Sequence, residues 1–404
     1  MLASLKSLRP VSFERNSTNR AAMASLILGR VVYAINWLNI AAVFSLIASE
    51  FQLDISGLGV VTATFYIGIG AFQVPGGIIA AKKGPRLTVI YGTTIASVSA
   101  LLTGFARNLA EIAVLRFLVG AGMALVFAPA LVLVIKLLKK GSEGLGVGIY
   151  NSAYSLGGVI GLSGWATISI GLGWRSGLIL GGLLGLGTSL LLAFFAPKDN
   201  LRSDFQIDLH CLKLILSNRL LIVLSIALLG ISIGSAVVQN FMAYYLEKVG
   251  NVGVGEAGVI ASLSVASAFI TGPFSGRVFD RFRNVNWLLL MTGVVMAIGI
   301  GIAFIGTLYS AITSSVLVGL ASGAGFTFGF AAAREANRLG SEYDTLAVSW
   351  VNSLQLSGTF VSPLLFSYFV IAFGYGYAWL CIALIAFLLI LPAVFSKISA
   401  RKGR

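Results

Sequence analysis

Basic residues in this chain are confined to a repeating set of positions between long apolar segments. Of the 28 Lys and Arg residues, eight lie at the two ends and fifteen lie in every second gap between twelve apolar runs. A membrane span needs about 20 apolar residues, and short loops rich in Lys and Arg stay on the cytoplasmic side. We therefore predict a multi-pass protein of the cell membrane that crosses it twelve times, with both ends in the cytoplasm.

The composition excludes most other classes of protein. Hydrophobic residues make up 57% of the chain and charged residues only 10%, whereas soluble proteins carry about 25% charged residues. The formal charge of +14 belongs to loops that face anionic lipid, so we expect no nucleic-acid partner. No nucleotide loop, metal-spaced His/Cys cluster or embedded Ser/His/Asp set is visible, so we expect no enzyme, cofactor or metal site. The two cysteines, Cys211 and Cys381, imply no disulfide.

The two halves of the chain repeat one another in order. Pro75 and Gly77 recur as Pro273 and Gly276, Gly120-Ala121-Gly122 as Gly323-Ala324-Gly325, and Asn151-Ser152 as Asn352-Ser353. The offsets, from 198 to 203 residues, lie near half of the chain length, and duplicated halves are common in transporters. We expect an all-α membrane protein of two pseudo-symmetric six-helix halves, residues 1–198 and 218–404, joined by a polar cytoplasmic linker at residues 199–217.

Motifs in both halves resemble those of the major facilitator superfamily. The stretch from Gly77 to Arg86, GIIAAKKGPR, is similar to the family's loop motif G-x-L-a-D-R-x-G-R-K, and GRVFDR from Gly276 to Arg281 resembles its second copy. The stretch that begins at Arg116, RFLVGAG, resembles the R-x-x-x-G-x-G pattern of the family's fourth span. The resemblance covers the whole chain and implies the major facilitator fold, with a substrate site near the membrane midplane.

Six residues of the loop motifs are expected to serve cytoplasmic gating or helix packing: Gly77, Gly84, Arg86, Gly276, Asp280 and Arg281. The first copy has Ala81 where the family has an acid, so a charge-pair latch is an option only in the second half, at Asp280. Five glycines are expected to let helices approach closely: Gly76, Gly77, Gly157, Gly158 and Gly161. The glycine spacing of the fifth span follows the family's antiporter motif only in part and does not identify an antiporter.

The acidic residues lie where they contribute little to a transport site. All 14 Asp and Glu residues fall in loops or near the ends of apolar runs, and the single histidine, His210, lies in the linker. A proton relay at the membrane midplane therefore has no visible carboxylate or imidazole carrier. For the same reason the chain offers no acidic group to bind a cationic drug.

Arg30 is the opposite case, because it lies about nine residues into the first apolar run. An arginine at a helix centre costs about 2.5 to 3.5 kcal/mol on insertion scales. Helical spacing places Arg30, Tyr33 and Trp37 on one face, with Asn36 alongside. Either Arg30 reaches the cytoplasmic headgroups or backbone carbonyls, or it is a cavity cation that binds an anionic substrate. We favour the cavity cation.

A second cation and several amides complete the predicted site. Arg116 makes a structural contact, with Glu111 as a neighbour, or adds positive charge to the cavity; the sequence leaves both interpretations open. The second half offers neutral hydrogen-bonding groups on the faces of its spans. The predicted substrate-binding residues are Arg30, Tyr33, Asn36, Trp37, Arg116, Asn151, Gln239, Asn352 and Gln355.

These features predict a secondary active transporter that moves a small anion, a monocarboxylate or an inorganic anion, by rocking its two halves around a central site. The alternative is a multidrug or neutral-solute exporter of the same fold, favoured by the 26 Phe and six Met that could line an apolar pocket. A receptor is disfavoured because no sizeable soluble domain extends from either side. We expect a monomer whose partners are the anionic solute and membrane lipid.

Overall fold

The protein is helical throughout the part of the chain that the structure describes. The computed structural model describes residues 17–138, 143–197, 209–282, 284–336 and 344–396, and none of these residues lies in a strand. Eleven segments within them are long and apolar enough to cross a membrane. The last segment, Ala347–Phe395, holds 49 residues and leaves helical geometry at Gly374, where φ is +82°. A span needs about 20 residues, so this segment is long enough for two spans, which agrees with the predicted count of twelve.

Three spans of the first half are interrupted helices. The first span is α1 (Ser17–Leu38), a 3-10 turn (Ala41–Val43) and α2 (Phe44–Phe51); the second and third are α3 (Ile55–Lys83) and α4 (Pro85–Thr103). The fourth is α5 (Leu109–Ala124) with α6 (Phe127–Lys136), and the fifth is α7 (Glu143–Val159), a π turn (Ile160–Gly164) and α8 (Trp165–Leu172). The sixth is α9 (Trp174–Phe195).

The second half has longer, less interrupted helices. They are α11 (Arg219–Lys248), α12 (Val254–Phe282), α13 (Val285–Ile302), a 3-10 turn (Ala303–Ile305), α14 (Leu308–Ala336), α15 (Asp344–Thr359) and α16 (Val361–Phe395). The predicted linker contains a short helix, α10 (Leu209–Leu216), and its residues 199–208 lie outside the described ranges. The exact boundaries of the two halves stay a prediction.

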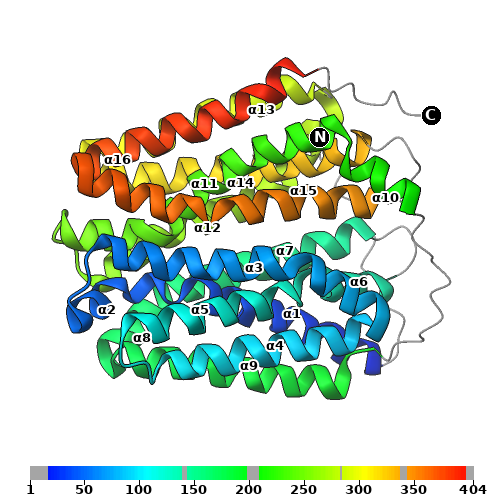
Figure 1. Ribbon diagram of the computed structural model, residues 1–404, viewed down its shortest axis with the longest axis horizontal. Coiled ribbons are helices and arrows are strands. Elements are labelled where there is room, and N and C mark those ends of the chain that lie inside the picture. The colour runs from blue at the N-terminus through cyan, green and yellow to red at the C-terminus, as the bar shows by residue number, and fades with distance from the viewer. Residues whose placement is uncertain (1–16, 139–142, 198–208, 283, 337–343, 397–404) are drawn as a thin grey trace, which may run out of the picture.

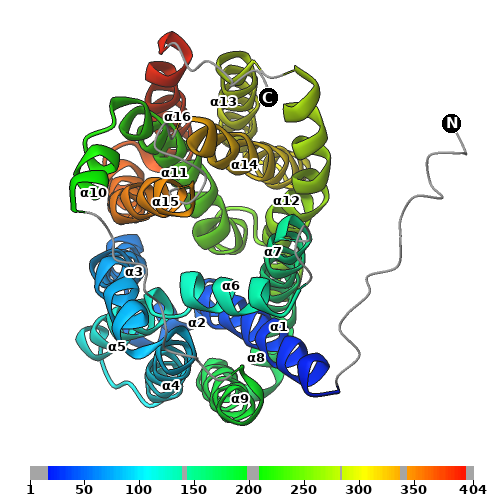
Figure 2. The same cartoon turned by 90° about the vertical axis from the view of Figure 1, so that its right-hand side faces the viewer.

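The two halves form neighbouring bundles, with α1 to α9 in one and α11 to α16 in the other (Figures 1 and 2). One end of the molecule carries α6 and α10, and the opposite end carries α2 and α8 (Figure 1). At the α2 end, Ser367 Oγ donates to the carbonyl oxygen of Ile55 at 2.9 Å, and the Phe44 ring lies 6.0 Å from that of Phe241. The bundles are therefore in direct contact at this end.

Arginine side chains join helix ends within the first half. Arg175 in α9 donates to the carbonyl oxygens of Gly104 and Ala106, at 3.1 and 2.7 Å, just after α4 ends. The same side chain pairs with Glu50 of α2 at 2.6 Å. Arg86, in the first turn of α4, donates to a carbonyl oxygen near the end of α9. Helix ends leave carbonyls without partners, and lipid cannot supply any, so these contacts satisfy groups that would otherwise destabilise the fold.

Glycines allow neighbouring spans to touch backbone to backbone. A Cβ added at Gly68 of α3 would overlap the carbonyl oxygen of Phe117 in α5, and one at Gly120 of α5 would overlap that of Phe65 in α3. The expectation of close approach is confirmed for Gly76, Gly157, Gly158 and Gly161. It is wrong for Gly77, where an added Cβ would meet no atom within 4 Å. Gly77 therefore lies on a face of α3 where no described residue packs closely.

Gly68→Ala should destabilise the protein, because the added methyl group must push α3 away from α5. Overpacking of this kind costs about 1 to 3 kcal/mol, which should lower the midpoint of thermal unfolding of the detergent-purified protein. Gly77→Ala is the matched control, since it makes the same change in the same helix where space is free. We expect the Gly77→Ala midpoint to equal or exceed the parent's. Equal midpoints for both variants would contradict this account of the α3–α5 contact.

Candidate functional site

Arg30 lies in α1, and its side chain is only 6% exposed. Its guanidinium carbon is surrounded by four aromatic rings at distances of 4.6 to 4.8 Å from their centroids. The rings belong to Tyr33, Phe127, Tyr150 and Tyr154. Each ring face attracts a cation through its quadrupole. We call these four rings the aromatic cage of Arg30; they come from α1, α6 and α7.

The cage does not satisfy every hydrogen-bond donor of Arg30. Within the described residues, its buried Nε and Nη1 atoms have no hydrogen-bond partner. Its low exposure also shows that the side chain does not extend to the protein surface. The arginine therefore keeps a positive charge and two unused donors inside the first half, the combination that recognises an oxyanion.

Trp37 packs against the cage from the end of α1. Its ring centroid lies 5.7 Å from that of Tyr33 and 5.9 Å from that of Tyr154. On its other side it contacts the ring of Phe65 in α3, at 4.8 Å. The predicted stripe of Arg30, Tyr33 and Trp37 thus lies on one face of α1, and all three side chains belong to one aromatic cluster.

Arg116 has a different environment from Arg30. Its side chain is 3% exposed, and its two terminal nitrogens donate to the carbonyl oxygens of Asn36 and Trp37, at 3.1 and 3.2 Å. The Phe65 ring lies 4.7 Å from its guanidinium carbon. Of the two interpretations the sequence left open, the structure shows the backbone contact. The contact is with α1 rather than with Glu111.

Glu111 instead helps to begin α5. Its carboxylate accepts hydrogen bonds from the backbone amide of Arg107, at 2.8 Å, and from the side chain of Asn108, at 3.1 Å. Asn108 in turn accepts from the Glu111 amide at 2.9 Å. This arrangement resembles a capping box, except that the acid accepts from the amide of Arg107, one residue before the N-cap Asn108. The Glu111 carboxylate is therefore used at the start of α5 and not by Arg116.

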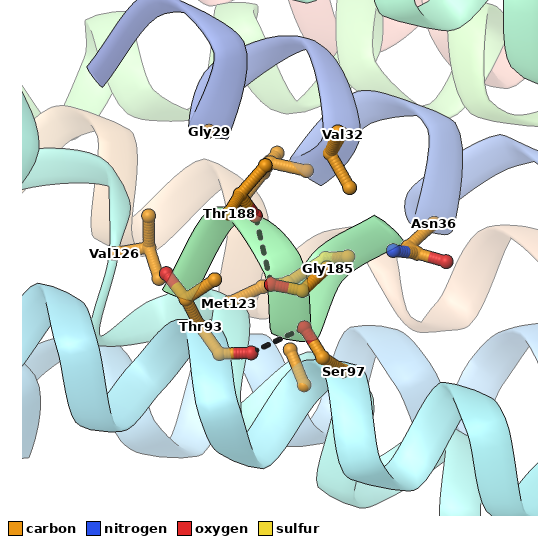
Figure 3. Close-up of a pocket in the computed structure, with 11 residues that line it drawn as sticks. Gly29, Val32, Asn36, Thr93, Ser97, Met123, Val126, Gly185 and Thr188 are labelled. Carbon is orange, nitrogen blue, oxygen red and sulfur yellow. Dashed lines mark hydrogen bonds between the residues drawn. The ribbon is translucent and has the colours of Figure 1, made fainter. Parts of the chain in front are cut away.

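The side chain of Asn36 reaches toward α9. Its side-chain nitrogen donates to the carbonyl oxygen of Gly181 at 3.0 Å. It also lines a cavity of about 20 Å³ between α1, α4 and α9, shown in Figure 3. Ser97 and Thr188 lie on other walls of this cavity, and both hydroxyls bond to nearby backbone carbonyls. A space of this size holds about one water molecule, so it is too small for an organic anion.

Two of the predicted residues of the second half, Asn352 and Gln355, are joined by a side-chain hydrogen bond. Ser232 of α11 donates to the side-chain oxygen of Gln355 in α15, and Gln355 donates to Asn352 at 3.0 Å. Both ends of the Gln355 amide are therefore occupied. Asn240 of α11 reaches across to the first half and donates to Tyr66 Oη at 3.4 Å. The tyrosine is next to Phe65 in α3.

The remaining predicted residues have varied positions. Gln239 and Asn352 are half-buried in α11 and α15, and Asn151 is exposed on α7. In the loop motifs, Gly84 has φ +90° and begins α4, Gly276 has no atom within 4 Å of an added Cβ, and Arg281 is exposed. The Asp280 side chain lies outside the described set. Sequence reasoning missed Phe127 and Tyr150; the four-residue spacing of Tyr150 and Tyr154 places both on one face of α7 and was the available signal.

Comparison with known proteins agrees with this architecture. Over 182 residues the chain is 33% identical to the probable sulfoacetate transporter of Cupriavidus necator, covering 45% of this chain and 42% of that protein. It is 26% identical over 153 residues to the 4-hydroxybenzoate transporter of Pseudomonas aeruginosa, covering 38% and 34%. The matched stretches thus span less than half of these curated relatives.

Solved structures share the fold across nearly the whole chain. A crystal structure of a D-xylose-proton symporter superposes with a TM-score of 0.80, covering 96% of this chain and all of that one at 15% identity. At this identity the likeness shows the fold alone. The family model of the Major Facilitator Superfamily matches residues 26–343. Since that match spans more than half of the sequence, this protein belongs to the Major Facilitator Superfamily.

Proposed function

We propose that this protein is a secondary transporter of a small organic anion whose carboxylate, or a similar acidic group, binds to Arg30. The observation that carries the proposal is the buried guanidinium, which among the described residues has two donors without a hydrogen-bond partner and no ion pair with an acid. A bidentate bond from arginine to a carboxylate is short, charge-assisted and geometrically specific. The solute itself would therefore supply the missing negative charge.

Two further observations support an anion over a cationic drug. The acidic residues of the described spans lie toward helix ends: Glu50 pairs with Arg175, and Glu247 is next to the last residue of α11. The relatives that resemble the chain include proteins named for sulfoacetate and 4-hydroxybenzoate, and both compounds are anions. One relative, from Bacillus subtilis, is named a multidrug transporter and is 24% identical over 302 residues. Its name supports the multidrug alternative, which we weigh against the buried arginine.

The amides of the second half would complete the site from the opposite bundle. Asn352 accepts a hydrogen bond from Gln355 through its oxygen, which leaves its side-chain nitrogen to donate to a solute oxygen. Such neutral donors suit hydroxyl or carbonyl groups on the body of an organic acid. Rocking of one bundle against the other, with the anion held between them, would provide alternating access. Asp280 and Arg281 would then serve the gate at the membrane edge and not the solute.

Removing the Arg30 charge should weaken anion binding without unfolding the protein. We expect Arg30→Gln to weaken binding by about tenfold to a hundredfold, the worth of a hydrogen bond to a charged group. Arg30→Lys should recover only part, because an ammonium lacks the planar pair of donors. The measurement is equilibrium binding to the purified protein of acetate, nitrate, 4-hydroxybenzoate and sulfoacetate, followed by counterflow of the tightest binder in vesicles.

Arg20→Gln is the control for that series, since Arg20 is an exposed basic residue of the same helix. It should leave affinity for every anion unchanged. A well-folded Arg30→Gln protein that binds the best anion with parental affinity would disprove the proposed site. Stronger binding of cationic dyes than of any anion would favour the exporter alternative.

We also propose that both chain ends and the linker face the cytoplasm, because both ends and every second gap between the apolar runs are rich in Lys and Arg. In a background with Cys211 and Cys381 replaced by serine, Ser203→Cys should react with an impermeant thiol reagent only after the membrane is opened. Asn251→Cys, in the loop between α11 and α12, should react from outside intact cells. The reverse pattern of labelling would overturn the topology.

A further inference from the structure

We propose that Arg116 is a positioning residue that holds the broken end of α1 and thereby shapes the anion site around Arg30. The inference rests on the proposed function, because it concerns the same site. It assigns to Arg116 no contact with the solute. Its effect on binding passes through Trp37 and the aromatic cage.

The first element of the argument is the break in the first span. The α-helix α1 ends at Leu38, and the chain does not resume regular helix until α2 begins at Phe44. The last four carbonyls of a helix lack amide partners from a following turn. Here the Ile35 carbonyl accepts from the amide of Asn39 at 2.8 Å. The next two carbonyls along the chain accept from Arg116 instead.

The second element is the fit between the guanidinium and these carbonyls. Asn36 and Trp37 are consecutive residues, and the two terminal nitrogens of Arg116 donate one hydrogen bond to each carbonyl. A lysine has a single nitrogen and cannot reproduce this fork. A cation at the C-terminal end of a helix is also favoured by the helix dipole. Arg116 therefore replaces the missing turn of α1 in both hydrogen bonding and charge.

The third element is the rigidity of the platform that carries Arg116. Its helix, α5, touches α3 backbone to backbone at Gly68 and Gly120, four residues beyond Arg116. The Phe65 ring of α3 covers the guanidinium at 4.7 Å. The backbone that carries Arg116 is therefore held by close helix packing and its guanidinium is covered by Phe65, so the two carbonyls at the end of α1 are bound from a well-packed position.

The consequence reaches Arg30 through Trp37. The carbonyl of Trp37 is held by Arg116, and its ring contacts Tyr33 and Tyr154, two rings of the cage. If the end of α1 loosened, Trp37 would lose its fixed place and the cage would lose its support on that side. Anion affinity would then fall although every group proposed to touch the anion is intact.

The test compares Arg116→Gln, Arg116→Lys and Arg30→Gln by hydrogen–deuterium exchange and by binding of the tightest anion of the panel above. In Arg116→Gln we expect exchange at residues 37–44 to accelerate at least about tenfold, which corresponds to the loss of one charge-assisted hydrogen bond. Anion affinity should fall in the same variant. Arg116→Lys should lie between it and the parent in both measurements, whereas Arg30→Gln should lose affinity with parental exchange at residues 37–44.

Two results would overturn the proposal. If Arg116→Gln lost affinity while exchange at residues 37–44 stayed parental, Arg116 would contact the anion directly. If exchange accelerated but affinity did not change, the end of α1 would not shape the site. Where Arg116→Gln does not fold, the same comparison is made with Arg116→Lys. Parental affinity in Arg30→Gln would refute the proposed function separately, since the exchange measurement on Arg116 variants does not depend on Arg30.

Discussion

Carbonyl groups at helix ends are the constraint on which this structure depends most. Inside a bilayer no water can accept or donate, so every interruption of a span must be compensated by protein groups. Polar side chains supply the compensation by bonding to carbonyls at or near the ends of other helices. The pairs are Arg86 to Ala193, Arg116 to Asn36 and Trp37, Arg175 to Gly104 and Ala106, Asn218 to Ala336, and Asn286 to Ala393 and Val394. Most of these contacts join helices that are distant in sequence, so they also fix how the spans pack.

Arg30 stands apart from that pattern because ring faces surround it. A cation over one ring gains about 0.5 to 2 kcal/mol, so four rings together offset an insertion cost of about 2.5 to 3.5 kcal/mol. The charge is therefore tolerated while the site is empty. The ring faces are weak hydrogen-bond acceptors, and among the described residues Nε and Nη1 have no hydrogen-bond partner, so on our proposal these two groups are left to bind a solute. If Arg30 binds the solute as we propose, this stability without a bound anion suits a carrier that must release its solute in each cycle.

Much of the architecture could be predicted because it depends on local patterns. Apolar runs and alternating basic gaps predicted the twelve spans, and repeated motifs predicted the two halves. Helical periodicity placed Arg30, Tyr33 and Trp37 on one face, since α1 is regular up to Leu38. The break that follows was not predicted, because no proline or glycine marks it. The break leaves carbonyls of α1 without amide partners, and they are bound by Arg116, about 80 residues away in the chain.

The sequence by itself determined the membrane class, the number of spans, the duplication and the presence of an arginine without an acid in its helix. Only the tertiary structure decided how the two buried arginines differ. Both lie in apolar runs of the sequence. In the structure Arg116 donates to backbone carbonyls, whereas Arg30 is surrounded by aromatic rings. The physical reason is that a buried charge is defined by its partners, and those partners come from other helices. Periodicity within a single span specifies a face, but the packing of spans specifies what that face meets.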